Sequence, residues 1–163
     1  MLPADEALAA NAAFVSAAAH AVRIAATAHQ QEKLEALRNA VLNAAAGSAP
    51  SDDVQMMFLD AVDSLTVSHV QVLKELTKRD RDKWTSRPGN YHRGDAIRPP
   101  KVEDAILTQI IRDLKNRGFV EVDTALDQLD VDRIGGSNVK LTEYGKAFLE
   151  FITSPLDRKD AAA

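Results

Sequence analysis

The sequence predicts a mainly helical protein with one small β-hairpin in its C-terminal half, and three observations lead to this fold class. From Ala4 to Ala46 the chain contains no Gly or Pro and is rich in alanine, as long helices are. Apolar residues then recur at helical spacing between residues 102 and 116. Between Gly118 and Thr142, two short segments with the β-branched character of strands flank an acidic loop.

Length and composition indicate one domain, or one compact domain with a helical appendage, in a chain of 163 residues. The chain has no cysteine, which excludes disulfides and thiolate metal sites and suits a cytoplasmic location. The stretch from residue 7 to 19 is alanine-rich rather than leucine-rich, and no basic residue precedes it, so no secretory signal is expected. No uninterrupted apolar run reaches about 18 residues, so no membrane span is expected either.

Charge is distributed unevenly along the chain. Residues 1–63 carry a net charge of −5, residues 64–119 carry +5 and residues 120–163 carry −4. A strongly basic protein would indicate a nucleic-acid partner, whereas this chain is acidic with one basic middle part. The distribution therefore lowers the expectation of DNA binding without removing it.

The alanine-rich N-terminal part is expected to form one long helix or a pair of helices. Pro3, Asp5 and Glu6 suit its first turn. An apolar residue recurs every seven positions within it, at Leu8, Val15 and Val22. Small side chains let helices approach closely, and two interpretations stay equally open: packing within the chain, or a self-association surface.

Two further helices are expected before the basic region. A Gly-Ser-Ala-Pro break at residues 47–50 precedes Ser51, which can cap the first of them, and Thr66 can cap the second. A methionine pair in the first of these helices is expected to fill the core: Met56 and Met57. His69 falls on the apolar side of the second helix, where a buried, hydrogen-bonded role is expected ahead of a catalytic or metal-binding one.

The segment from Val102 to Ile152 has the order helix, strand, loop, strand, helix. The first helix carries an apolar arc at helical spacing, formed by Ile106, Leu107, Ile110, Ile111 and Leu114. Gly118 is expected to end this helix with a positive φ. The strand from Phe119 to Val122 should pair with residues 138–141, and Thr142 should cap the last helix.

This block resembles the second half of a winged-helix domain. The likeness is carried by Leu114, by Arg117-Gly118-Phe119-Val120 and by Leu141-Thr142-Glu143-Tyr144-Gly145. The resemblance implies a third helix, a wing between the strands and DNA binding as a function. Residues 32–73 together with this block also resemble a pattern found in uncharacterised bacterial proteins, which implies a shared fold and no particular activity.

The basic region from Lys78 to Lys101 is expected to form a loop, and it contains eight basic and three acidic residues. Its turn signals leave room for only a degenerate second helix of a helix-turn-helix. Aromatic and arginine side chains are enriched among binding hot spots, and five in this region form a candidate partner-binding loop: Trp84, Arg87, Tyr91, Arg93 and Arg98. The alternatives are that Trp84 packs onto the body while the charges are solvated, or that the charges pair with the acidic parts of the chain.

A candidate nucleic-acid face lies opposite the apolar arc of the helix after the basic region. Its residues are of types that contact phosphates or base edges: Thr108, Gln109, Arg112, Lys115 and Asn116. An ordinary solvated helix face is the favoured interpretation, because the proposed wing would repel phosphates. Four aspartates there face one Arg133: Asp123, Asp127, Asp130 and Asp132.

No arrangement of residues indicates an enzyme or a cofactor. The four histidines lack metal-ligand spacing, and the aspartates between residues 123 and 132 lack the glycine and closing glutamate of a calcium loop. The sequence therefore predicts a helical region at 1–63, a winged-helix-like domain at 64–152 and a flexible tail at 153–163. The expected function is a non-enzymatic regulatory or scaffolding module that forms homo-oligomers or binds a protein with an acidic surface. The alternative is a winged-helix DNA-binding transcriptional regulator.

Overall fold

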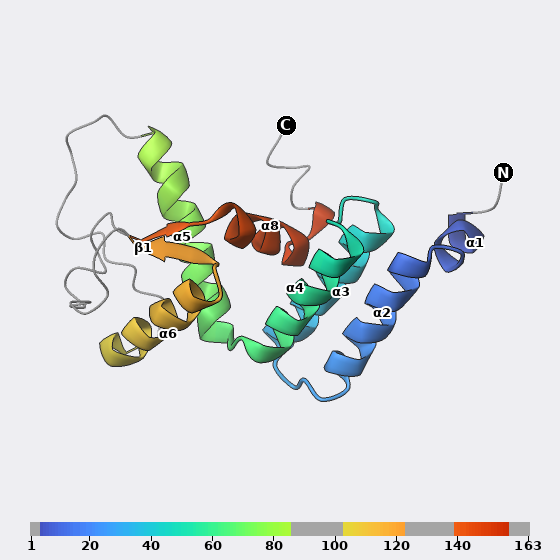
Figure 1. Ribbon diagram of the computed structural model, residues 1–163, viewed down its shortest axis with the longest axis horizontal. Helices are drawn as coiled ribbons and strands as arrows, with labels where there is room; N and C mark the ends of the chain where they lie inside the picture. The colour runs from blue at the N-terminus through green and yellow to red at the C-terminus, as the bar shows by residue number, and fades with distance from the viewer. Residues whose placement is uncertain (1–3, 86–102, 123–138, 157–163) are drawn as a thin grey trace. The chain divides into compact units, whose positions relative to one another are not determined.

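The computed structural model describes residues 4–85, 103–122 and 139–156 (Figure 1). Seven helices and one two-stranded antiparallel sheet lie in these residues, which confirms the predicted mainly helical fold class with a small sheet. The chain forms two compact units. Unit 1 comprises residues 1–67 and 147–163, and unit 2 comprises residues 68–146, so the last helix begins in unit 2 and ends in unit 1.

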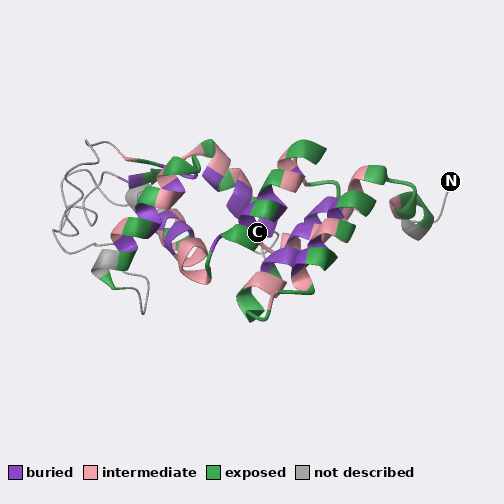
Figure 2. Ribbon diagram, turned by 60° about the horizontal axis from the view of Figure 1, so that its bottom comes forward, coloured by how far each residue is buried: buried purple, intermediate pink, exposed green. Residues whose placement is uncertain are grey.

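Unit 1 contains α1 (Ala4–Ala9), α2 (Ala12–Ala25), α3 (Gln31–Ala45) and α4 (Asp52–Ser64). Helix α2 packs against both α3 and α4, and Figure 1 shows the three helices side by side. Several of the side chains buried among these helices are alanines: Ala17 and Ala21 on α2, and Ala36 and Ala40 on α3. Figure 2 shows how buried and exposed residues alternate along the helices, as packing on one side requires.

The alanine-rich N-terminal part is divided into three helices, which is more than the expected long helix or helix pair. The first break falls at Asn11, whose backbone is extended and whose side-chain oxygen accepts a hydrogen bond from the Phe14 backbone N–H at 3.2 Å. Asparagine satisfies the free N–H groups of a helix start better than it extends a helix. The second break covers residues 26–30 and begins at the C-cap, Ala26.

Aromatic rings of α4 and α8 (Glu143–Ile152) meet in the core of unit 1. The ring of Phe58 is fully buried, with centroids 5.5 Å from Phe148 and 5.7 Å from Phe151. Such edge and tilted contacts stabilise aromatic clusters beyond the area they bury. The expectation that both methionines of α4 fill this core is wrong for Met57, which is 54% exposed because its position falls on the outer side of the helix.

The C-terminal end of α8 is held by a buried asparagine on α3. Asn43 has no exposed surface, and its side-chain amide donates hydrogen bonds to the backbone oxygens of Phe151 at 2.7 Å, Thr153 at 2.9 Å and Glu150 at 3.3 Å. Asn39, one turn away, donates to the Ile152 oxygen at 3.1 Å. These bonds satisfy carbonyl groups at the end of a helix that have no partner within it.

Unit 2 contains α5 (Val67–Thr85), α6 (Asp104–Asn116) and strands β1 (Val120–Val122) and β2 (Val139–Leu141). Helix α5 begins directly after Thr66, as expected. The predicted arc of α6 is buried at four positions, Leu107, Ile110, Ile111 and Leu114. At Ile106 the prediction is wrong: this side chain is 51% exposed, at the edge of the arc and in the first turn of the helix.

The predicted hairpin is confirmed. Gly118 ends α6 with φ of +79°, and β1 pairs antiparallel with β2 so that Val120 lies opposite Leu141. Thr142 then caps α8: its hydroxyl oxygen accepts from the Gly145 N–H at 3.0 Å, and the hydroxyl lies 2.6 Å from the Gly118 oxygen, to which it donates. One threonine therefore joins the start of β1 to the start of α8.

Gly145 allows the first turn of α8 to lie directly on the backbone of Phe119. A Cβ atom at position 145 would come within 2.2 Å of the Phe119 carbonyl oxygen, far inside van der Waals contact. The ring of Tyr144 lies beside that of Phe119, with centroids 5.0 Å apart. The spacing of Leu141-Thr142 and Gly145 in the sequence is thus explained by one capping bond and one close backbone approach.

Candidate interaction surfaces

The outward face of α2 is apolar and exposed. It consists of the exposed positions of the helix and its C-cap: Ala12, Val15, Ser16, Ala19, Val22, Arg23 and Ala26. Among these residues only Arg23 is charged, whereas surface helices ordinarily place charged residues on the face away from the core. Val15 is 47% exposed and Val22 is 69% exposed, while Leu8 on α1 is half-buried.

This finding bears on the two interpretations of the seven-residue apolar pattern. The face of α2 that packs within unit 1 carries Ala17, Ala21 and Ile24, not the valines. Packing within the described part of the chain therefore does not explain why positions 15 and 22 carry apolar side chains. The seven-residue pattern instead marks a helix face that is open to solvent.

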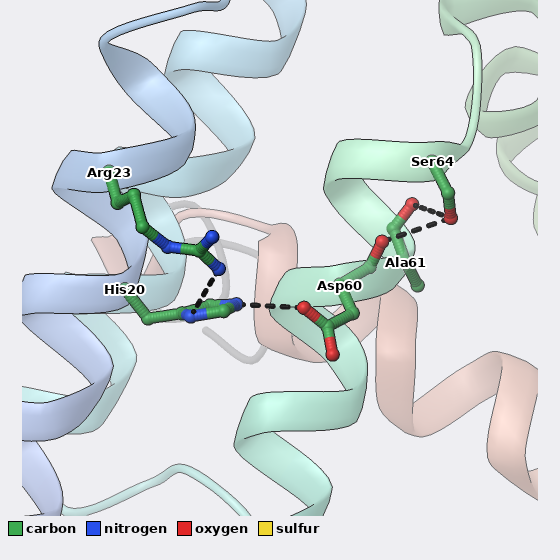
Figure 3. Close-up of polar contacts among 5 residues, drawn as sticks. All are labelled: His20, Arg23, Asp60, Ala61 and Ser64. Atoms are coloured by element: carbon green, nitrogen blue, oxygen red, sulfur yellow. Dashed lines mark hydrogen bonds and ion pairs between the residues drawn. The ribbon is translucent and has the colours of Figure 1, made fainter.

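A hydrogen-bonded chain of three side chains lies at one edge of the outward face (Figure 3). His20 Nε2 lies 2.8 Å from Asp60 Oδ1 on α4, and Arg23 Nη2 lies 3.0 Å from His20 Nδ1. A guanidinium can only donate, so His20 Nδ1 accepts and Nε2–H donates to the Asp60 carboxylate. Both ring nitrogens are thus occupied, which leaves neither free to act as a base for a nucleophile in this arrangement.

These hydrogen bonds join α2 to α4 and hold the Arg23 side chain at the edge of the outward face. Sequence reasoning missed it, because His20 and Asp60 are 40 residues apart and only the packing of the two helices brings them together. The spacing of His20 and Arg23, three residues apart on one helix, was the one local signal for part of the contact.

The candidate nucleic-acid residues lie together on α6. Gln109, Arg112 and Asn116 are exposed, and Thr108 and Lys115 are half-buried beside them. Arg112 donates from Nη1 to Gln109 Oε1 at 3.2 Å. The five residues thus form a polar face with two positive charges and no carboxylate among its members.

Asp113, an acidic residue of α6, is paired with residues outside this polar face. Asp113 Oδ2 lies 2.9 Å from Arg117 Nε and 3.3 Å from His69 Nε2 on α5. Burial lowers the pKa of His69 from its ordinary 6.5; the charge of Asp113 opposes this shift and that of Arg117 adds to it. The contact with Asp113 fits the expected hydrogen-bonded role for His69, whose side chain is 13% exposed.

Several predicted features fall outside the described residues. The expected loop from Lys78 to Lys101 is wrong at its start, because α5 continues to Thr85. Trp84 therefore belongs to the last turn of α5, and its side chain is outside the described residues. The other members of the candidate partner-binding loop are outside them too: Arg87, Tyr91, Arg93 and Arg98. The acidic loop between β1 and β2 is outside them too. Within the described ranges, no helix is long and apolar enough to cross a membrane, and no three acidic or histidine side chains are grouped to hold a metal ion.

Comparisons of the chain with protein-family models, curated proteins and solved structures found no match.

Proposed function

We propose that this protein is a non-enzymatic regulatory or scaffolding module that self-associates through the outward face of α2. The single observation that carries the proposal is the exposure of Val15 and Val22 on a helix whose other side is fully engaged in unit 1. Exposed apolar surface is costly in water, and its removal drives association. Scattered apolar residues are normal on a surface, but here they repeat along one face that carries a single charge.

The expected association is moderate in strength. Stable protein interfaces bury about 800 Å² on each partner, and one face of a helix with the length of α2 supplies only part of that area. Alanine and valine also lose little side-chain entropy when they are ordered, which favours a small interface made of them. We therefore expect a dimer to be populated when the concentration of the chain is about 50 μM.

The test is the mass of the intact chain by light scattering after size exclusion. Val22→Glu places a carboxylate at the most exposed apolar position of the face and should give a monomer, with an unchanged helical circular-dichroism signal because position 22 is exposed in the fold. Met57→Glu is a matched control, since Met57 is an exposed apolar residue on another helix of unit 1. It should remain a dimer, and a wild-type chain that is monomeric at about 50 μM would refute the proposal.

The alternative function, a winged-helix DNA-binding regulator, is favoured by the polar face of α6. In this alternative α6 is the third helix of a winged-helix domain, followed by the hairpin β1–β2 and by α8, and Arg112 contacts DNA. The four aspartates between the strands weaken it, because carboxylates beside phosphates oppose binding.

A fluorescence titration with duplex DNA at physiological salt separates the two functions. We expect weak binding that does not depend on sequence. Tight binding to one sequence, abolished by Arg112→Ala but retained by Lys74→Ala on the exposed surface of α5, would establish the alternative instead.

A further inference from the structure

The apolar residues of the outward face of α2 have the same order of residue types from either end of the helix. Its apolar positions follow the order Ala12, Val15, Ala19, Val22, Ala26, which is symmetric in residue type about Ala19. Ala19 also lies at the middle of α2, which runs from Ala12 to Ala25. A surface that is symmetric about its own centre matches a second copy of itself related by a two-fold axis.

We propose that two copies of the chain pair α2 with α2 in antiparallel orientation, with the two-fold axis at Ala19. This inference rests on the proposed function and specifies its partner and geometry. Ala19 then lies against Ala19 of the second copy, and Ala12 lies against Ala26 of the second copy. Because the axis passes through the middle of α2, the two helices overlap along their whole length, about 21 Å for 14 residues.

Side-chain size supports close pairing of the two helices. An alanine stands at every seventh position of the face, at residues 12, 19 and 26, and the valines stand between them. A seven-residue repeat keeps one seam of a helix directed at its partner. Alanine along the seam lets the two helix axes approach to the short end of the usual range, about 8 Å, while the valines fill the space beside it.

Charge selects the antiparallel orientation. In a parallel pair, Arg23, the one charged residue of the outward face, would meet Arg23 of the second copy, and the helix dipoles would be aligned. In the antiparallel pair the two arginines lie on opposite sides of the axis. The helix dipoles then oppose each other, which also favours the antiparallel orientation.

Disulfide trapping tests this geometry directly, because the natural chain has no cysteine to compete. Each single-cysteine variant is incubated with oxidised glutathione, and dimers are separated on non-reducing gels. A disulfide requires the two Cα atoms to lie within about 7 Å. In the antiparallel pair, positions 12 and 12 of the two copies are about 21 Å apart along the axis, as are positions 26 and 26.

We expect Ala19→Cys to link to itself about tenfold or more faster than Arg38→Cys, an exposed control on α3, because a dimer holds facing thiols at a high effective concentration. Ala12→Cys and Ala26→Cys should each fail to link to themselves and should link to each other when mixed. Light scattering on the wild-type chain is run in parallel.

The outcomes separate the inference from the function on which it rests. A wild-type dimer in which Ala26→Cys links to itself as fast as Ala19→Cys would overturn the antiparallel orientation and leave self-association standing. A dimer in which no α2 variant links faster than Arg38→Cys would overturn the inference by placing the interface elsewhere. A wild-type monomer would overturn both.

Discussion

Replacement of Asn43 by alanine is expected to destabilise unit 1 more than any other removal of one polar side chain discussed above. Asn43 is fully buried, and its amide makes close hydrogen bonds to the carbonyls of Phe151 and Thr153 at 2.7 and 2.9 Å, with a longer contact to Glu150. Its own oxygen lies 3.3 Å from the Ser48 hydroxyl, which donates to it. Alanine at position 43 has no amide, so the carbonyl oxygens of Phe151 and Thr153 lose the hydrogen bonds that Asn43 donates.

The size of the loss follows from these contacts. Each close hydrogen bond contributes about 1 kcal/mol net, and a buried carbonyl left without a partner costs about 1–3 kcal/mol. Water that enters the space left by the amide recovers part of this loss. The free energy of unfolding should therefore fall by about 2–4 kcal/mol, a large part of the stability of a small domain.

The matched comparison is Asn39→Ala, one turn along α3. Asn39 is half-buried and donates a single bond, to Ile152, so about 1 kcal/mol should be lost. Urea unfolding followed by circular dichroism at 222 nm measures the free energy of unfolding of both variants. Its dependence on urea concentration should be the same as for wild type. If Asn43→Ala loses less than Asn39→Ala, the idea that Asn43 anchors the end of α8 is wrong.

Two further predictions concern unit 2. Gly145→Ala should lower the stability of unit 2 by about 1–3 kcal/mol, because the new methyl group would overlap the Phe119 carbonyl oxygen and force α8 away from β1. A thermal midpoint equal to wild type would contradict this prediction. Because burial lowers the pKa of His69 below 6.5, the unfolded chain binds this proton more readily than the folded one, so stability is retained above pH 6.5 and falls as the pH drops through that value. His69→Gln cannot titrate, and its free energy of unfolding should fall less than that of wild type between about pH 7 and pH 5; equal losses would show that His69 is not responsible.

Local pattern was sufficient to locate α6, β1, β2 and α8. Helical spacing located α6, Gly118 ended it, and β-branched segments located the two strands that pair, because these signals act between residues close in sequence. The Thr142 cap was also predictable, since the residue type and its position before an apolar helix are both local. The same reasoning predicted the five polar residues of α6 that lie together beside its buried arc.

Which side of α2 is buried was decided by the tertiary structure. The repeat of Leu8, Val15 and Val22 was visible in the sequence, but its exposure follows from alanines on the other side of α2, which allow the closer approach to α3 and α4. Likewise, the sequence gives no reason to place Asn43 beneath the end of α8, because its partners lie more than 100 residues away. Periodicity therefore locates a helix, while the neighbours available at each face determine whether that face enters the core or remains open to bind a partner.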